Sequence, residues 1–120
     1  GAGGMVYLNN CNACHRSNGT GADGVFPSLA GNSVVNAKDP TSLIRIVLVG
    51  SAMPSTELRP SALAMPGFGW RLSDDNVAAL LSFVRSSWGN RGEAVTSAQV
   101  AKVRKTIAPA EEKSAQSSSR

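Results

Sequence analysis

The five residues Cys11-Asn12-Ala13-Cys14-His15 constrain this chain more than any other part of it. They form a Cys-x-x-Cys-His motif, the spacing at which a haem c is attached covalently. Cys11 and Cys14 are three residues apart, so one helical turn places both thiols on the same face. There the thiols can form thioethers to the two vinyl groups of one haem. His15 follows directly and can bind the iron from the proximal side, so the motif predicts one covalent haem c.

Other uses of this motif fit the residues less well. A disulfide between Cys11 and Cys14 would close a very short loop and gain little loop entropy. A thioredoxin-like redox pair would need flanking strands, and no alternating apolar run lies beside the motif. Zinc needs four ligands, whereas the chain has two cysteines and one histidine, so a carboxylate would have to be the fourth. A haem-free zinc or interaction module is therefore a minor alternative.

The second axial ligand must be something other than histidine, because His15 is the only histidine in the chain. Met53 and Met65 are each followed by proline, which restricts the preceding residue to extended conformations. Such a stiff loop is suited to present a thioether to iron, as in His/Met-ligated haems. Met65 is the better candidate, because it lies farther downstream and precedes Gly67-Phe68-Gly69-Trp70 and the start of a helix. Met53 is the alternative ligand.

The rest of the chain is predicted to be mostly helical. Helices are expected from about residue 3 into the motif, over 41–49, from Ser73 to Gly89, and over 97–107. Glycines and a proline between 19 and 31 predict a long loop, and a second loop carrying both candidate methionines is expected over 51–72. Beyond Pro109 the composition predicts disorder. We expect a haem domain at residues 1–90, with a C-terminal helical extension and disordered tail at 91–120.

Composition and charge limit the possible partners and locations. Aromatic residues make up 5% of the chain, which is thin for an unaided core, and a buried porphyrin would supply apolar bulk. The net charge of +4 belongs mainly to residues 91–120, and basic residues are not interleaved with aromatics, so no nucleic-acid partner is expected. No apolar run suggests a membrane span or a signal peptide, which suggests a mature or excised chain. Because bacteria attach haem c outside the cytoplasm, a periplasmic location is expected.

Taken together, these residues resemble class I cytochrome c over roughly residues 3 to 90. Gly-Val-Phe-Pro-Ser-Leu-Ala-Gly at 24–31 is similar to the family's Pro-x-Leu-x-Gly loop, in which the proline carbonyl accepts a hydrogen bond from the proximal histidine. The resemblance implies that Pro27 orients His15 and raises its basicity. It also implies an all-α fold of three to five helices wrapped around one covalent haem c.

The same resemblance assigns structural roles to four residues. Gly3 and Tyr7 match the positions at which the family's first helix crosses its last one, where a small residue lets the two backbones approach. Leu80 and Phe83 match the facing residues on the last helix.

Two further segments show a narrower resemblance. Ala-Met-Pro-Gly-Phe-Gly-Trp-Arg-Leu-Ser-Asp at 64–74 and Ser-Phe-Val-Arg-Ser-Ser-Trp-Gly-Asn at 82–90 resemble the cytochrome subunits of bacterial membrane-bound alcohol, gluconate and glucose dehydrogenases. Those subunits usually carry three haem domains, and this chain is similar to the last one. In that group the ligand is the methionine before Pro-x-Phe-Gly, which favours Met65. A free-standing monohaem cytochrome is the alternative.

The resemblance implies single-electron transfer from a dehydrogenase partner or cofactor towards a quinone, an oxidase or another haem, without catalysis by the chain itself. The expected partners are a dehydrogenase subunit, other cytochrome domains and a terminal oxidase, with membrane association only through a complex. Arg45, Trp70 and Arg71 are candidates for contacts with the haem propionates. A haem enzyme or gas sensor with an open sixth site is a weaker alternative, because no second histidine could serve as its distal acid–base group.

Overall fold

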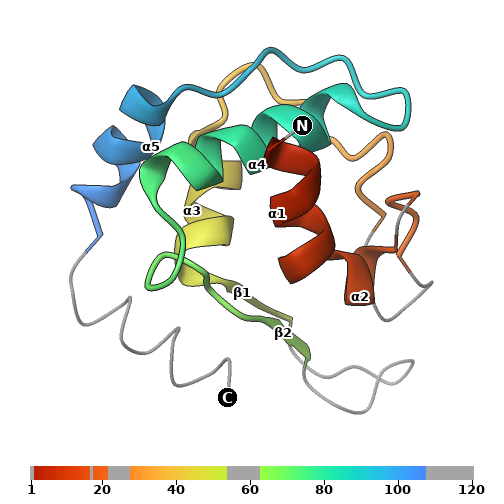
Figure 1. Cartoon of the computed structure of the whole chain (residues 1–120), viewed down its shortest axis with the longest axis horizontal. Helices are drawn as coiled ribbons and strands as arrows, with labels where there is room; N and C mark the ends of the chain where they lie inside the picture. Colours follow the sequence, from red (N-terminus) through yellow and green to blue (C-terminus); the bar gives the residue numbers. More distant parts are fainter. Residues whose placement is uncertain (1, 17, 22–27, 54–62, 108–120) are drawn as a thin grey trace.

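The computed structural model describes residues 2–16, 18–21, 28–53 and 63–107 (Figure 1). These residues form five helices and a two-stranded antiparallel ribbon: α1 (Ala2–Asn10), α2 (Asn12–His15), α3 (Thr41–Val49), β1 (Ser51–Met53), β2 (Leu63–Met65), α4 (Asp74–Ser86) and α5 (Ser97–Arg104). The predicted all-α class is confirmed, and the ribbon is an addition within the segment predicted to be a loop. Pro27 and the tail beyond residue 107 lie outside the described residues.

Helices α1 and α4 cross at a contact that only glycine allows (Figure 1). A Cβ atom at Gly3 would lie 2.1 Å from the Ala79 carbonyl oxygen and 2.9 Å from the Cβ of Phe83. The buried Tyr7 ring lies next to this point, with its centroid 5.6 Å from that of Phe83 and 5.1 Å from that of Trp88. The predicted contact of Gly3 and Tyr7 with Phe83 is confirmed.

Helix α4 begins as predicted and ends earlier. The Ser73 hydroxyl accepts a hydrogen bond from the Asn76 N–H, and two aspartates occupy the first turn, where the helix dipole favours negative charge. The helix ends at Ser86 instead of Gly89. The hydroxyl of Ser87 donates to the Phe83 carbonyl, and such local hydrogen bonds compete with those of the helix.

Helix α3 covers the predicted residues 41–49, with Pro40 and not Asp39 at its N-cap position. The Asp39 carboxylate accepts hydrogen bonds from the backbone N–H and the hydroxyl of Thr41, and these bonds lower the pKa of Asp39. Gly50, at φ 86°, ends the helix. The side of α3 that faces the other helices carries the buried residues Leu43, Ile44, Val47 and Leu48.

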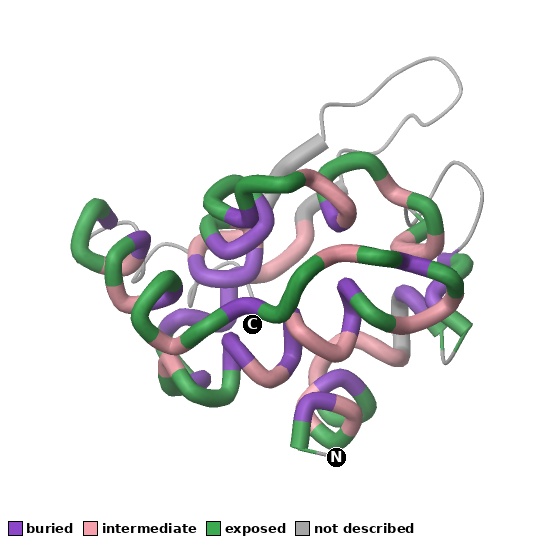
Figure 2. Tube along the Cα trace, turned by 90° about the horizontal axis from the view of Figure 1, so that it is seen from above, coloured by how far each residue is buried: buried purple, intermediate pink, exposed green. Residues whose placement is uncertain are grey.

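Residues 91–107 share the core of the preceding helices. The Thr96 side chain and Gln99 form a capping box at the start of α5, which packs against both α3 and α4. Its apolar residues and those beside it, Val95, Val100, Val103 and Ile107, belong to the same buried cluster as those of α3 and α4. Figure 2 shows the buried positions turned inward. Across the described ranges, every helix is too short or too polar to span a membrane.

Candidate functional site

The motif residues lie where α1 passes into α2. The Cys11 N–H donates to the Tyr7 carbonyl at 2.8 Å and the His15 N–H donates to the Cys11 carbonyl at 3.0 Å, so helical turns continue through the motif. Cys11 is half-buried against the core, and His15 is buried. Of Cys14 the structure describes only the helical backbone. One short segment therefore carries all three predicted attachment and ligand residues.

The backbone around His15 is held from two directions. The buried Tyr7 hydroxyl donates to the carbonyl of Arg16, and the Gly21 N–H donates to the carbonyl of His15 at 3.1 Å. Burial, with a smaller contribution from nearby Cys11, raises the pKa of Tyr7 to about 12, so this phenol remains a proton donor at neutral pH. Tyr7 therefore links the helix crossing to the residue that follows the proximal histidine.

Pro27 lies outside the described residues, and Asn90 holds the chain that follows it. This buried side chain donates to the Leu29 carbonyl at 3.0 Å and accepts from the Gly31 N–H at 2.8 Å. The same amide group also donates to the Val84 carbonyl at the end of α4. Asn90 is not among the predicted site residues, although it ends the 82–90 segment that carries the narrower resemblance. The role of Pro27 stays a prediction.

The candidate ligand Met65 lies at the end of the ribbon, where it pairs with Ser51, while Met53 pairs with Leu63. The Met65 side chain is half-buried and packs against the core. Of Met53 only the backbone is described. Gly50 comes so close to Met65 that a Cβ there would lie 2.4 Å from the Met65 carbonyl oxygen. The backbone of Met65 is therefore held against the end of α3.

The residues after Met65 are tied to the same helix. The Phe68 N–H donates to the Val47 carbonyl at 2.8 Å, and the Gly69 N–H donates to the Leu48 carbonyl at 3.0 Å. These carbonyls belong to the last turn of α3, which has no intrahelical donors for them. The backbone carbonyls at the C-terminal end of α3 therefore hold the loop that follows the candidate ligand. We name residues 65–72 the ligand loop.

Trp70 and Arg71, two of the three residues predicted to contact propionates, lie on this loop. The Trp70 indole N–H donates to the Gly67 carbonyl at 3.0 Å, so its single donor is engaged within the ligand loop. The Arg71 guanidinium lies 5.7 Å from the centre of the Trp70 ring. Arg45 is exposed on α3. The propionate contacts of these residues stay predictions.

The donor set suits haem c better than another metal. It combines an imidazole, a thioether and two cysteines in the attachment spacing, which are the groups used by His/Met-ligated haem c. Among the residues that the structure describes, no three His, Cys, Asp or Glu side chains gather in a way that could hold a metal ion.

Replacing Gly50 with alanine tests whether α3 seats Met65. The substitution forces a side chain into φ 86° and against the Met65 carbonyl, so we expect the free energy of unfolding to fall by about 2–5 kcal/mol. Gly89→Ala is the matched control, since its φ is 82° and its Cβ would meet nothing within 4 Å. Denaturant unfolding should show a smaller loss for Gly89→Ala, of about 1–2 kcal/mol. Equal losses would contradict the close approach.

The helical attachment motif and the seated methionine loop define a c-type haem protein, and comparison with known proteins agrees. The Cytochrome c family model matches residues 2–88, and the chain belongs to this family, whose members bind haem c covalently. The class I fold predicted from the sequence is thereby confirmed.

Several relatives are parts of larger redox proteins. The chain is 49% identical over 109 residues to the cytochrome c subunit of an alcohol dehydrogenase (quinone) from Gluconobacter oxydans, covering 90% of the chain and 23% of the relative. It is 44% identical over 105 residues to the gluconate 2-dehydrogenase cytochrome c subunit of Pantoea cypripedii, covering 86% and 24%. Cytochrome c-552 of Thermus thermophilus is 28% identical over 92 residues, covering 73% and 69%.

The chain spans about a quarter of the length of the dehydrogenase subunits that it matches. Those relatives are named as cytochrome subunits and not as catalytic ones. The predicted class of function is confirmed at this level: the chain is a haem c electron-transfer domain of the cytochrome c family.

Proposed function

We propose that this domain relays single electrons through one haem c, attached at Cys11 and Cys14 and ligated by His15 and Met65. The observation that carries the proposal is the seating of both ligand segments. Tyr7 and Gly21 hold the chain around His15, whereas α3 holds the ligand loop. Two ligands on separately anchored segments can keep their positions when the iron changes oxidation state. The single Cys-x-x-Cys-His motif supports one haem per copy of this chain.

The bound haem would supply the redox-active iron, and the chain's residues set its properties. The Met65 thioether favours ferrous iron and so raises the reduction potential relative to stronger donors. Phe68 and Leu72, both buried in the ligand loop, extend the apolar core beside Met65 and help to exclude water. Arg45 and Arg71 supply positive charge for the propionates. No proton-transfer group is required, because the transfer is of an electron alone.

The relatives suggest where the electrons come from and go. We propose that a dehydrogenase subunit, or another haem of the same complex, reduces this domain, and that a quinone, an oxidase or a further haem reoxidises it. The contact would be small and short-lived, as is typical of electron-transfer partners. We place the domain in the periplasm, with any membrane association made through the complex. A free-standing monohaem cytochrome is the second candidate, favoured by the match to cytochrome c-552 over 69% of that protein's length.

The optical spectrum of the oxidised protein tests the proposed site. We expect a low-spin haem with a weak far-red band from sulphur-to-iron charge transfer, and haem that remains with the protein after denaturation and extraction. A high-spin spectrum that changes at once with cyanide would mean an open sixth site. Haem that is lost on extraction would rule out thioether attachment at Cys11 and Cys14.

A further inference from the structure

The side chain of Arg104, the last residue of α5, reaches the ligand loop. Its Nη1 donates to the Gly69 carbonyl at 2.7 Å and its Nη2 donates to the Leu72 carbonyl at 2.9 Å. Its Nε pairs with the Asp74 carboxylate at 2.8 Å, just where α4 begins. One planar guanidinium therefore joins three points on the segment from the ligand loop to α4.

The backbone of Gly69 is consequently held through both its N–H and its carbonyl group. Its N–H donates to Leu48 of α3, while its carbonyl accepts from Arg104 of α5. Gly69 is buried and lies four residues after Met65, so these bonds restrict how far the ligand loop can open. The Arg104 side chain is 25% exposed and that of Asp74 34% exposed. Charge-assisted hydrogen bonds shielded to this degree are stronger than those of a fully exposed pair.

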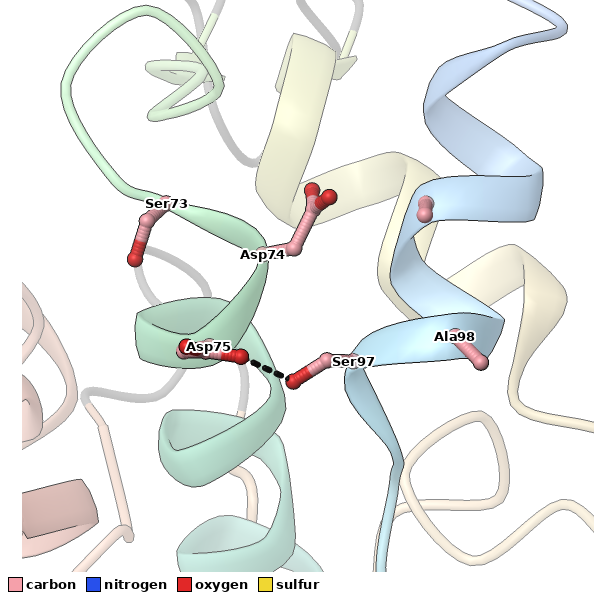
Figure 3. Close-up of a pocket in the computed structure, with 6 residues that line it drawn as sticks. Ser73, Asp74, Asp75, Ser97 and Ala98 are labelled. Carbon is pink, nitrogen blue, oxygen red and sulfur yellow. Dashed lines mark hydrogen bonds between the residues drawn. The ribbon is translucent and has the colours of Figure 1, made fainter.

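Contacts other than those of Arg104 also hold α5 against α4. The role of Arg104 can therefore be tested separately from the packing of its helix. Ser97 donates a hydrogen bond to Asp75 on the first turn of α4, and Figure 3 shows this contact between the two helices. Val100, Val103 and Ile107 are buried in the shared core. We therefore expect α5 to stay docked without the Arg104 guanidinium, while the ligand loop loses two hydrogen bonds.

We infer that Arg104 is a positioning residue for the axial methionine: from a segment beyond the family-matched residues 2–88, it holds the ligand loop closed and resists displacement of Met65 from the iron. The inference rests on the proposed ligation by Met65. An added ligand such as imidazole can bind the iron only when Met65 leaves it, so imidazole affinity reports how easily the loop opens.

The test compares imidazole binding to the oxidised, haem-loaded protein and three variants. Arg104→Met keeps an apolar stem and removes the donors, and we expect it to bind imidazole roughly tenfold more tightly. Arg104→Lys keeps the charge but cannot donate to both carbonyls in the same geometry. Its imidazole affinity should therefore lie between those of the parent and Arg104→Met. Lys105→Met is the control, because Lys105 is the next residue, its side chain is exposed, and the substitution removes the same charge. Its affinity should equal that of the parent.

The outcomes separate this inference from the proposed ligand. A parent protein without the far-red band, or one whose band survives Met65→Ala, would overturn both. A parent with a Met65-dependent band and equal imidazole affinity in Arg104→Met would overturn the role of Arg104 alone. Circular dichroism and denaturant unfolding are measured in parallel. If imidazole binds more tightly only in variants that have lost helical circular-dichroism signal, the role of Arg104 is packing. A folded Arg104→Lys variant would then bind imidazole as the parent does, and the inference would be overturned.

Discussion

Met65→Ala is expected to abolish the far-red band of the oxidised protein and to lower its reduction potential. The thioether is the ligand that raises the potential, and axial ligands set haem potentials over a range of about 0.8 V. The sixth position would then be open to cyanide in the ferric state and to carbon monoxide in the ferrous state. The haem itself should stay attached, because Cys11 and Cys14 are unchanged. Optical spectra and a redox titration of the same sample measure all of these effects.

Met53→Ala is the natural control, since Met53 is the other methionine followed by proline. Its backbone pairs with Leu63 at the opposite end of the ribbon from the Met65 pair. We expect its far-red band and reduction potential to match those of the parent. The reverse pattern, with the band lost in Met53→Ala and kept in Met65→Ala, would make Met53 the ligand. It would also mean that the seating of Met65 on α3 serves only the fold.

The parts of the fold that the sequence predicted well depend on local signals. Gly50 ends α3 and Ser73 starts α4, because a left-handed glycine or a capping side chain acts within a few residues of its own position. The attachment motif is equally local, since two cysteines and a histidine within five residues must share one helical turn. No distant contact is needed to recognise any of them.

The parts that the sequence did not predict depend on contacts between distant segments. Strands β1 and β2 have three residues each, too few to show an alternating pattern, and they pair because the chain returns to the end of α3. Asn90 satisfies carbonyls 61 and 6 residues away, and nothing in its neighbouring sequence distinguishes it from an ordinary turn residue.

Helix α5 was predicted from a local pattern, but its packing partners and the contacts of Arg104 were not. Val100, Val103 and Ile107 predicted an apolar side, but periodicity cannot say which surface that side covers. The structure places it on α3 and α4, in the same core as the preceding residues. The Arg104 contacts with two carbonyls could not be expected, because backbone acceptors are present at every residue and carry no sequence signal.

Gly3→Ala should destabilise the protein strongly, although alanine is the better helix former. Its methyl group would lie 2.1 Å from the Ala79 carbonyl oxygen, which belongs to the backbone of α4 and cannot rotate away. We expect a net loss of roughly 1–3 kcal/mol in the free energy of unfolding as α1 is pushed off α4. Denaturant unfolding followed by circular dichroism measures this loss.

Gly4→Ala isolates the cause, because the next residue of the same helix gains the same methyl group. That Cβ would lie 3.5 Å from Cε1 of Phe83, an ordinary contact, so only the helix-propensity gain of up to about 1 kcal/mol remains. The two alanine variants should therefore shift the unfolding midpoint in opposite directions. Equal stability of the two would mean that α1 and α4 approach less closely than the structure shows. Because Tyr7 links this crossing to the residue after His15, a displaced α1 should also disturb the proximal side of the haem.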